Sequence, residues 1–181
     1  SPLNSMYYYC DFTNACGTMV DSVFIDVVSA NINAGSDTVI CPGETALLWA
    51  TGGVSYWWQP LSSLNVGTTS LVSATPSQST MYYVSGTDLN GCVGVDSVWV
   101  GLFPTPYVYA GPDVYAMIDD EVQLSATSLT PGPYVWSPSE FLSCVVCSNP
   151  IAVPNQNYTY VVSYTDVNGC TASDAVTIYY D

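Results

Sequence analysis

The sequence predicts an all-β protein made of small antiparallel β-sandwiches in tandem, arranged as a rod. Two observations carry this prediction: a long internal repeat, and short segments of aromatic and β-branched residues punctuated by 13 Gly and 12 Pro. No helical periodicity persists for three turns. Roughly seven short strands in a repeat of about 77 residues are typical of a small sandwich.

The repeat defines the expected organisation. A tripeptide that begins with Asn and ends with Cys occurs three times. Each copy follows a tyrosine-rich run and precedes an Asp-Ser-Val or Asp-Ala-Val run. The three copies are Asn14-Ala15-Cys16, Asn90-Gly91-Cys92 and Asn168-Gly169-Cys170. We therefore expect two complete units at 31–103 and 104–181, preceded by the C-terminal strands of a partial unit at 1–30. The partial unit has exposed strand edges, which missing upstream chain or a neighbouring molecule must complete.

Each complete unit shows the same strand signals in the same order. The first are the apolar or alternating runs 45–49 and 121–125. Trp58 and Trp136 then stand where sandwiches place a core tryptophan.

The second half of each unit predicts a hairpin. The aromatic and β-branched runs 82–85 and 160–163 lead into Asn-Gly, which favours a tight turn with positive φ at both central residues. The returning strands are expected at 96–100 and 174–179.

Composition excludes many functions. The chain has no Lys, Arg or His and 15 acidic residues, for a formal net charge of -15. Binding of nucleic acid, nucleotide phosphate or anionic membrane requires cations, and triad catalysis requires an imidazole. No apolar run reaches the 18 or so residues of a membrane span. We therefore predict a protein that is not an enzyme and has no catalytic residues.

Several motifs resemble a known family. They are Ala-Gly-x-Asp at 34–37 and 110–113, Cys-Pro-Gly-Glu at 41–44, Trp-x-Pro at 58–60 and 136–138, the run 142–150, and Asn-Gly-Cys. These motifs resemble the PKD-like and Ig-like repeats of very large Bacteroidota surface proteins, including gliding-motility-associated adhesins exported by the type IX pathway. The resemblance implies extracellular display, a stalk or adhesive role, and no catalytic residues. The complete lack of Lys and Arg departs from it.

Seven cysteines in such a chain argue for disulfides. The resemblance implies a Cys41–Cys92 bond, because the family shows these two positions together. Cys170 would then stay unpaired, because Met117 stands where the preceding unit has Cys41.

The other cysteines suggest two local bonds. Cys144 and Cys147 would clip a loop, and Cys10 with Cys16 could bracket the first hairpin. A redox or zinc role for Cys-x-x-Cys is the alternative, but it needs a βαβ context or two further ligands.

Calcium is the one cofactor that the carboxylates suggest. Asp37 with Asp88, and Asp113 with Asp166, are expected to converge at the same end of a sandwich. A second acidic cluster lies at 119–121. The alternative is that Asp and Asn before Gly cap their own turns and that the charge is simply solvated.

Aromatic residues and possible glycan acceptors both point to the surface. The runs 7–9, 56–58 and 179–180 exceed what one inward strand face can absorb, which favours protein contacts over sugar stacking. O-glycan acceptors of the Asp-Ser/Thr-aliphatic type (resembling the O-glycan acceptor of the same bacterial group) are expected at Ser22, Thr38 and Ser97, and an Asn-glycan sequon begins at Asn157.

The sequence thus predicts an extracellular structural or adhesive segment of a surface stalk or fibre. Its partners would be neighbouring repeats or copies of itself, and glycans. The first alternative is a filament subunit whose residues 1–30 add strands to a neighbour's sandwich. The second alternative is a carbohydrate-binding module.

Overall fold

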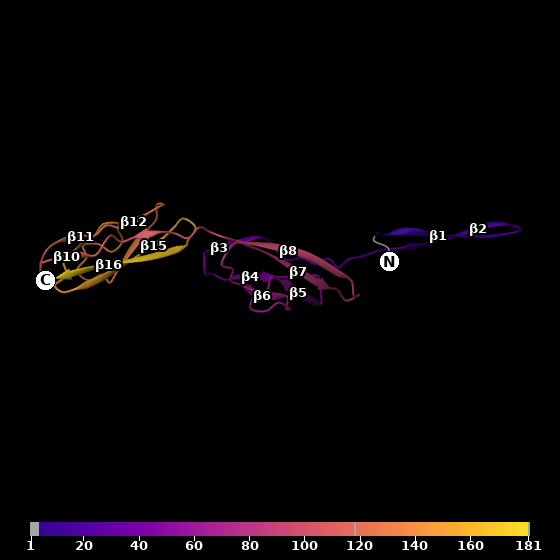
Figure 1. Cartoon of the computed structure of the whole chain (residues 1–181), viewed down its shortest axis with the longest axis horizontal. Coiled ribbons are helices and arrows are strands. Elements are labelled where there is room, and N and C mark those ends of the chain that lie inside the picture. Colours follow the sequence, from indigo (N-terminus) through magenta and orange to yellow (C-terminus); the bar gives the residue numbers. More distant parts are fainter. Residues whose placement is uncertain (1–3, 118, 181) are drawn as a thin grey trace. The chain divides into compact units, whose positions relative to one another are not determined.

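The chain is all-β and forms two compact units. The computed structural model describes residues 4–117 and 119–180. The first unit takes residues up to Thr38 and Thr45–Val100, and the second takes Val39–Glu44 with the residues from Gly101 onward. Both are β-sandwiches, so the predicted fold class is confirmed (Figure 1). No helix in the described part of the chain is long and apolar enough to cross a membrane.

The sandwich of the first unit contains two sheets, and the same unit also includes the separate hairpin at residues 6–25. The larger sheet has the order β3-β8-β7-β5, and the smaller pairs β4 with β6. The bounds are β3 Thr38–Ile40, β4 Ala46–Trp49, β5 Ser55–Gln59, β6 Leu71–Ala74, β7 Thr80–Thr87 and β8 Val93–Leu102. Leu48 and Val72 from the small sheet are buried, as are Trp58, Tyr82 and Val98 from the large one. Alternate strand residues point to opposite faces, so each strand gives the core every second side chain.

The second unit repeats this plan with a main sheet that again has four strands and with shorter strands in the remaining pairs. Its main sheet has the order β10-β16-β15-β13, and two further pairs are β11 with β14 and β9 with β12. The bounds are β9 Val108–Tyr109, β10 Val114–Ala116, β11 Val122–Gln123, β12 Thr127–Ser128, β13 Tyr134–Ser137, β14 Ile151–Ala152, β15 Tyr158–Thr165 and β16 Thr171–Tyr180. Trp136, Tyr160 and Ile178 belong to its core. Burial raises the pKa of Tyr160 to about 12, and its hydroxyl donates to the Glu140 carbonyl at 3.0 Å.

The turn of each long hairpin differs from the prediction. Thr87 pairs with Val93 across the first, so the loop spans 88–92 rather than the two residues of a tight Asn-Gly turn. Gly91 and Gly169 have φ of 80° and 84°, whereas Asn90 and Asn168 are not among the residues described with positive φ. The Asp88 carboxylate accepts from Asn90 N and Cys92 N at 2.8 and 2.9 Å, which stabilises the wider loop.

The N-terminal hairpin forms a two-stranded sheet of its own. Strands β1 (Met6–Asn14) and β2 (Gly17–Ile25) pair with each other, and neither pairs with another described strand. Every residue of both strands is exposed. Among the described strands, β1 and β2 thus leave their outer edges unpaired, whereas the assignment of 1–30 to a partial unit stays a prediction.

The segment 39–44 belongs by contacts to the second unit, although it precedes most of the first unit in sequence. Phe103 N donates to the Ile40 carbonyl at 2.9 Å, and Cys41 is bonded to Cys170. The sequence repeats 31–103 and 104–181 thus do not coincide with the compact units in this segment.

Adjacent tryptophans on β5 test the assignment of the core. We expect Trp58→Ala to lower the free energy of unfolding of the first unit by about 3–5 kcal/mol, because its side chain is fully buried and its indole N–H donates to Thr69 O at 3.0 Å. Trp57→Ala, at a side chain that is 49% exposed, should cost less than about 1 kcal/mol. Urea unfolding of both variants measures the difference, and equal losses would contradict this core.

Candidate functional site

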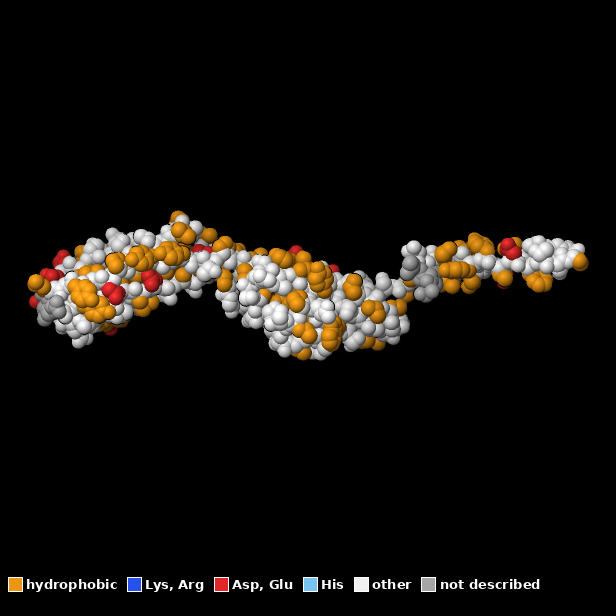
Figure 2. All heavy atoms as spheres, in the orientation of Figure 1, with side chains coloured by type: hydrophobic (Ala, Val, Ile, Leu, Met, Phe, Trp, Pro, Cys, Tyr) orange, Lys and Arg blue, Asp and Glu red, His pale blue; other side chains and the backbone are white. Residues whose placement is uncertain are grey.

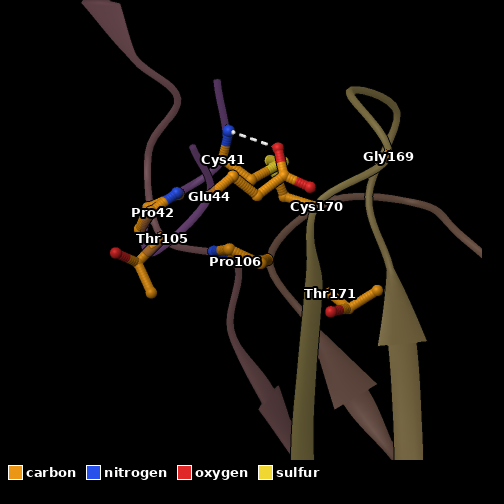
Figure 3. Close-up of a pocket in the computed structure, with 8 residues that line it drawn as sticks. All are labelled: Cys41, Pro42, Glu44, Thr105, Pro106, Gly169, Cys170 and Thr171. Carbon is orange, nitrogen blue, oxygen red and sulfur yellow. Dashed lines mark hydrogen bonds between the residues drawn. A yellow bond between two sulfur atoms is a disulfide. The ribbon is translucent and has the colours of Figure 1, made fainter. Parts of the chain in front are cut away.

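The candidate site is a disulfide between a tight turn and a hairpin loop (Figure 3). The turn is 41–44, which follows β3. Glu44 N donates to the Cys41 carbonyl at 3.0 Å, and Cys41 N donates to the Glu44 carboxylate at 3.2 Å. Gly43 has a φ of 85°, which glycine adopts without steric cost. The turn therefore holds the Cys41 side chain at a defined place.

The hairpin loop 166–170 between β15 and β16 is equally well determined. The Asp166 carboxylate accepts from Asn168 N and Cys170 N, both at 2.9 Å. Asp166 N in turn donates to the Cys170 carbonyl at 2.9 Å. These bonds use one acidic side chain to close the loop, and they place Cys170 at its base, where it is 1% exposed.

The Cys41–Cys170 bond joins residues 129 positions apart, with a Cα–Cα distance of 5.4 Å. Thr105 and Pro106 lie beside it and help to line a small pocket of about 190 Å³ (Figure 3). A cross-link over so long a loop lowers the entropy of the unfolded chain, which stabilises the fold by about 5 kcal/mol on the chain-entropy model. In sequence, it connects the repeat 31–103 with the repeat 104–181.

The Cys41–Cys92 bond implied by the resemblance is wrong, and so is the expectation that Cys170 is unpaired. The reason is strand direction. Cys92 immediately precedes β8, whereas Cys41 follows Ile40, which accepts from Phe103 N just beyond the other end of β8. Ten residues of strand separate these ends by roughly 33 Å, far beyond the reach of a disulfide.

One of the two local bonds is present. Cys144 and Cys147 form a disulfide, as predicted, and the Cys147 carbonyl accepts from the buried Trp136 indole at 3.0 Å. Both sulfurs are used in this bond, so they are not thiolates available to zinc.

The Cys10–Cys16 bond does not form, and that prediction is wrong. Cys10 lies on β1 opposite Asp21, while Cys16 sits in the turn beyond the Asn14–Gly17 pair. The four residue steps from Cys10 to Asn14 extend about 13 Å, which exceeds the Cα separation that a disulfide bridges.

The predicted calcium pairs do not converge. Asp37 accepts from Trp99 N, whereas Asp88 accepts from Cys92 N, and these two donors are on the order of 20 Å apart along β8. Asp113 and Asp166 are separated in the same way, because they accept from Thr177 N and Cys170 N. No group of three or more metal-ligating side chains occurs among residues 4–117 and 119–180.

The repeated carboxylates instead accept backbone hydrogen bonds. The Asp96 carboxylate accepts from Ala34 N and the Asp174 carboxylate from Ala110 N, each at 2.8 Å. Within the acidic cluster 119–121, Asp120 accepts from Met117 N at 2.9 Å, as Glu44 does from Cys41 N. In a chain without cations, these N–H groups take the place of salt-bridge partners. The capping alternative thus describes these residues better than the calcium hypothesis.

Outward aromatic side chains are present on the larger sheet of the first unit. Trp57 and Tyr83 line an open groove of about 450 Å³ together with Gln59 and Val95. An open, largely apolar groove with aromatic side chains and one amide is compatible with either a sugar ring or a protein partner.

The predicted glycan acceptors occupy different environments. Ser22 and Asn157 are exposed, whereas Thr38 and Ser97 are partly buried. The Asn157 side-chain oxygen also accepts from Tyr180 N at 2.8 Å. Modification at these four residues stays a prediction.

Comparison with known proteins finds immunoglobulin-type neighbours. Neither a family model nor a curated protein matches the sequence. Similar solved structures include the insect immune protein hemolin (13% identity, 97% of this chain and 56% of that chain, TM-score 0.42). Others are DIP-gamma IG1+IG2 (11%, 84% and 98%, 0.40) and titin domains I67–I69 in an E-to-A variant (11%, 98% and 75%, 0.37).

Removing the long-range disulfide should destabilise the second unit. We expect Cys170→Ser to lower its free energy of unfolding by about 2–5 kcal/mol, because the unfolded chain regains the entropy of a long open loop. Cys92→Ser is the matched control at a free thiol in an equivalent loop, and it should change stability by less than about 1 kcal/mol. Denaturant unfolding under non-reducing conditions measures both, and a silent Cys170→Ser would contradict the role of this bond.

Proposed function

We propose that the chain is a non-enzymatic, extracellular structural segment of an adhesive surface stalk or fibre. The carrying observation is the Cys41–Cys170 disulfide, which connects two consecutive sequence repeats covalently. Disulfides persist in oxidising compartments outside the cytosol. The absence of Lys and Arg removes every trypsin cleavage site, which suits exposure to proteases. The resemblance to Bacteroidota surface repeats supports the same setting and export by the type IX pathway.

The disulfide gives this segment a specific way to carry tension. When the two ends of the chain are pulled, the covalent path runs from Ser1 to Cys41, across the sulfur–sulfur bond and on from Cys170. The 129-residue separation between the two cysteines is bypassed. At about 3.5 Å per residue, roughly 450 Å of chain is thereby protected from extension.

Single-molecule pulling on the oxidised chain tests this load path. The extension should lack the roughly 450 Å that becomes available after reduction or in Cys170→Ser. The control is Cys144→Ser with Cys147→Ser, which opens a bond inside the bypassed segment and should leave the oxidised extension unchanged. Release of the full length from the oxidised wild-type chain would refute the proposal that load passes through this bond.

Labelling of intact source cells tests the location. An antibody against the folded chain should decorate extended structures outside the unpermeabilised cell, and external protease should remove the signal. An antibody to a cytosolic protein serves as the permeability control. Signal that appears only after permeabilisation would refute extracellular display.

A second candidate is a filament subunit that completes a neighbour's sandwich with β1 and β2. The observation that favours it is the exposure of apolar side chains along this hairpin (Figure 2). In strand addition, an extended segment pairs with an exposed sheet edge and its alternate side chains enter pockets of the partner. Concentration-dependent polymers of the purified chain would favour this candidate, whereas a monomer at micromolar concentration would count against it.

A further inference from the structure

The loop that contains Cys92 has the same hydrogen bonds as the loop that contains Cys170, the residue bonded to Cys41. Asp88 N donates to the Cys92 carbonyl at 2.9 Å, as Asp166 N does to the Cys170 carbonyl. Cys92 N donates to the Asp88 carboxylate at 2.9 Å, which matches the bond from Cys170 N to Asp166. The two cysteines are therefore held in equivalent positions at the start of equivalent strands.

Only one of the two equivalent cysteines is bonded. Cys170 is covered by the turn 41–44 and linked to Cys41, whereas Cys92 is a free thiol with intermediate exposure. The corresponding turn of the other repeat, which begins at Met117, carries no sulfur nucleophile. Cys92 thus has the position of a bonded cysteine without a partner thiol.

The hairpin β1–β2 is a second, independent feature: all of its strand residues are exposed, so no described segment covers it. Tyr7 aligns with Tyr82, which is 0% exposed in the complete unit. On the hairpin, Tyr7 pairs with Phe24, their ring centroids are 4.8 Å apart, and the two side chains are 54% and 50% exposed. An aromatic position that lies in the core of the complete unit is therefore in solvent on β1–β2, on a face that it shares with Phe24.

The complete unit identifies what covers this aromatic position. Residues 31–74 form the rest of the first sandwich and contribute Leu48, Trp58 and Val72 to its core. The Ser63 hydroxyl also forms a hydrogen bond with the Tyr82 hydroxyl. The same segment carries the turn with Cys41, which bonds the hairpin loop of the following repeat. One polypeptide would therefore supply both the cover for β1–β2 and a thiol for Cys92.

We propose that β1–β2 and Cys92 together bind a segment with the pattern of residues 31–74 from a further repeat, whose Cys-Pro-Gly-Glu turn forms a disulfide with Cys92. The proposal rests on the proposed function and names the partner. The two thiols lose two protons and two electrons to a low-molecular-weight disulfide such as oxidised glutathione, which becomes two molecules of thiol. The product repeats the Cys41–Cys170 link one unit earlier along the series.

Capture of the segment in trans tests the proposal. A polypeptide of residues 31–74, in which Cys41 is the single cysteine, is mixed with the whole chain in a redox buffer of reduced and oxidised glutathione. We expect a reducible one-to-one adduct, and mass mapping after digestion at acidic or aromatic residues should locate it at Cys92. Cys92→Ser in the chain should abolish the adduct, whereas Cys16→Ser, in the turn outside both strands, should leave it unchanged.

A shorter probe separates docking from simple thiol reactivity. The peptide 38–46 contains the cysteine turn but lacks the core strands, so it should form at least about tenfold less adduct at equal concentration. Equal yields from both probes, or an adduct distributed among Cys10, Cys16 and Cys92, would overturn the proposal.

A fused variant keeps the test decisive if the isolated segment is insoluble. A copy of residues 31–74 placed ahead of Ser1 should pair its cysteine with Cys92, and β1–β2 should become protected from hydrogen exchange. The matched control carries Cys41→Met in the added copy, as at Met117, and should retain the protection without the bond. Protection without the bond in the unmodified fusion would refute the disulfide while leaving the proposed function intact.

Discussion

Each sandwich depends on covering the inner face of its last two strands. In the second unit, β15 and β16 contribute Tyr160, Val162, Val176 and Ile178 to the core, and all four are buried by strands from earlier in the repeat. Burial of this area is the main favourable term in folding. The hairpin β1–β2 has the same kind of sequence but no such cover. The earlier strands of each repeat and its last two strands thus stabilise each other.

Electrostatics in this molecule follow from the absence of cations. Each carboxylate that recurs in the repeat accepts backbone N–H groups: Asp88 and Asp166 close the hairpin loops, while Asp96 and Asp174 accept from Ala34 N and Ala110 N near the start of each repeat. Such charge-assisted bonds are stronger than neutral ones. Acidic residues thereby determine loop geometry, including the geometry that presents each hairpin cysteine.

The disulfide pattern connects the fold with the load-bearing role that we propose. A bond within one repeat would protect only that repeat, whereas the Cys41–Cys170 bond spans most of two. This bond uses the thiols of both Cys41 and Cys170. Cys92, the equivalent of Cys170 in the preceding repeat, stays a free thiol. A series of such repeats would be linked by one bond per junction, with tension passing mainly through the bonds and the short segments between them.

Local pattern in the sequence was sufficient for the all-β class, the repeat, the buried Trp58 and Trp136, and the Cys144–Cys147 bond, because each depends on residues close in the chain or on strand alternation. The long-range pairing was not accessible in this way. Cys41 and Cys92 share one repeat, but the length of β8 holds them at opposite ends, and only the tertiary structure brings Cys41 beside Cys170. Likewise, strand direction alone decided that Asp37 and Asp88 lie apart. Sequence pattern specifies which residues can pair, whereas the three-dimensional path of the strands determines which of them meet.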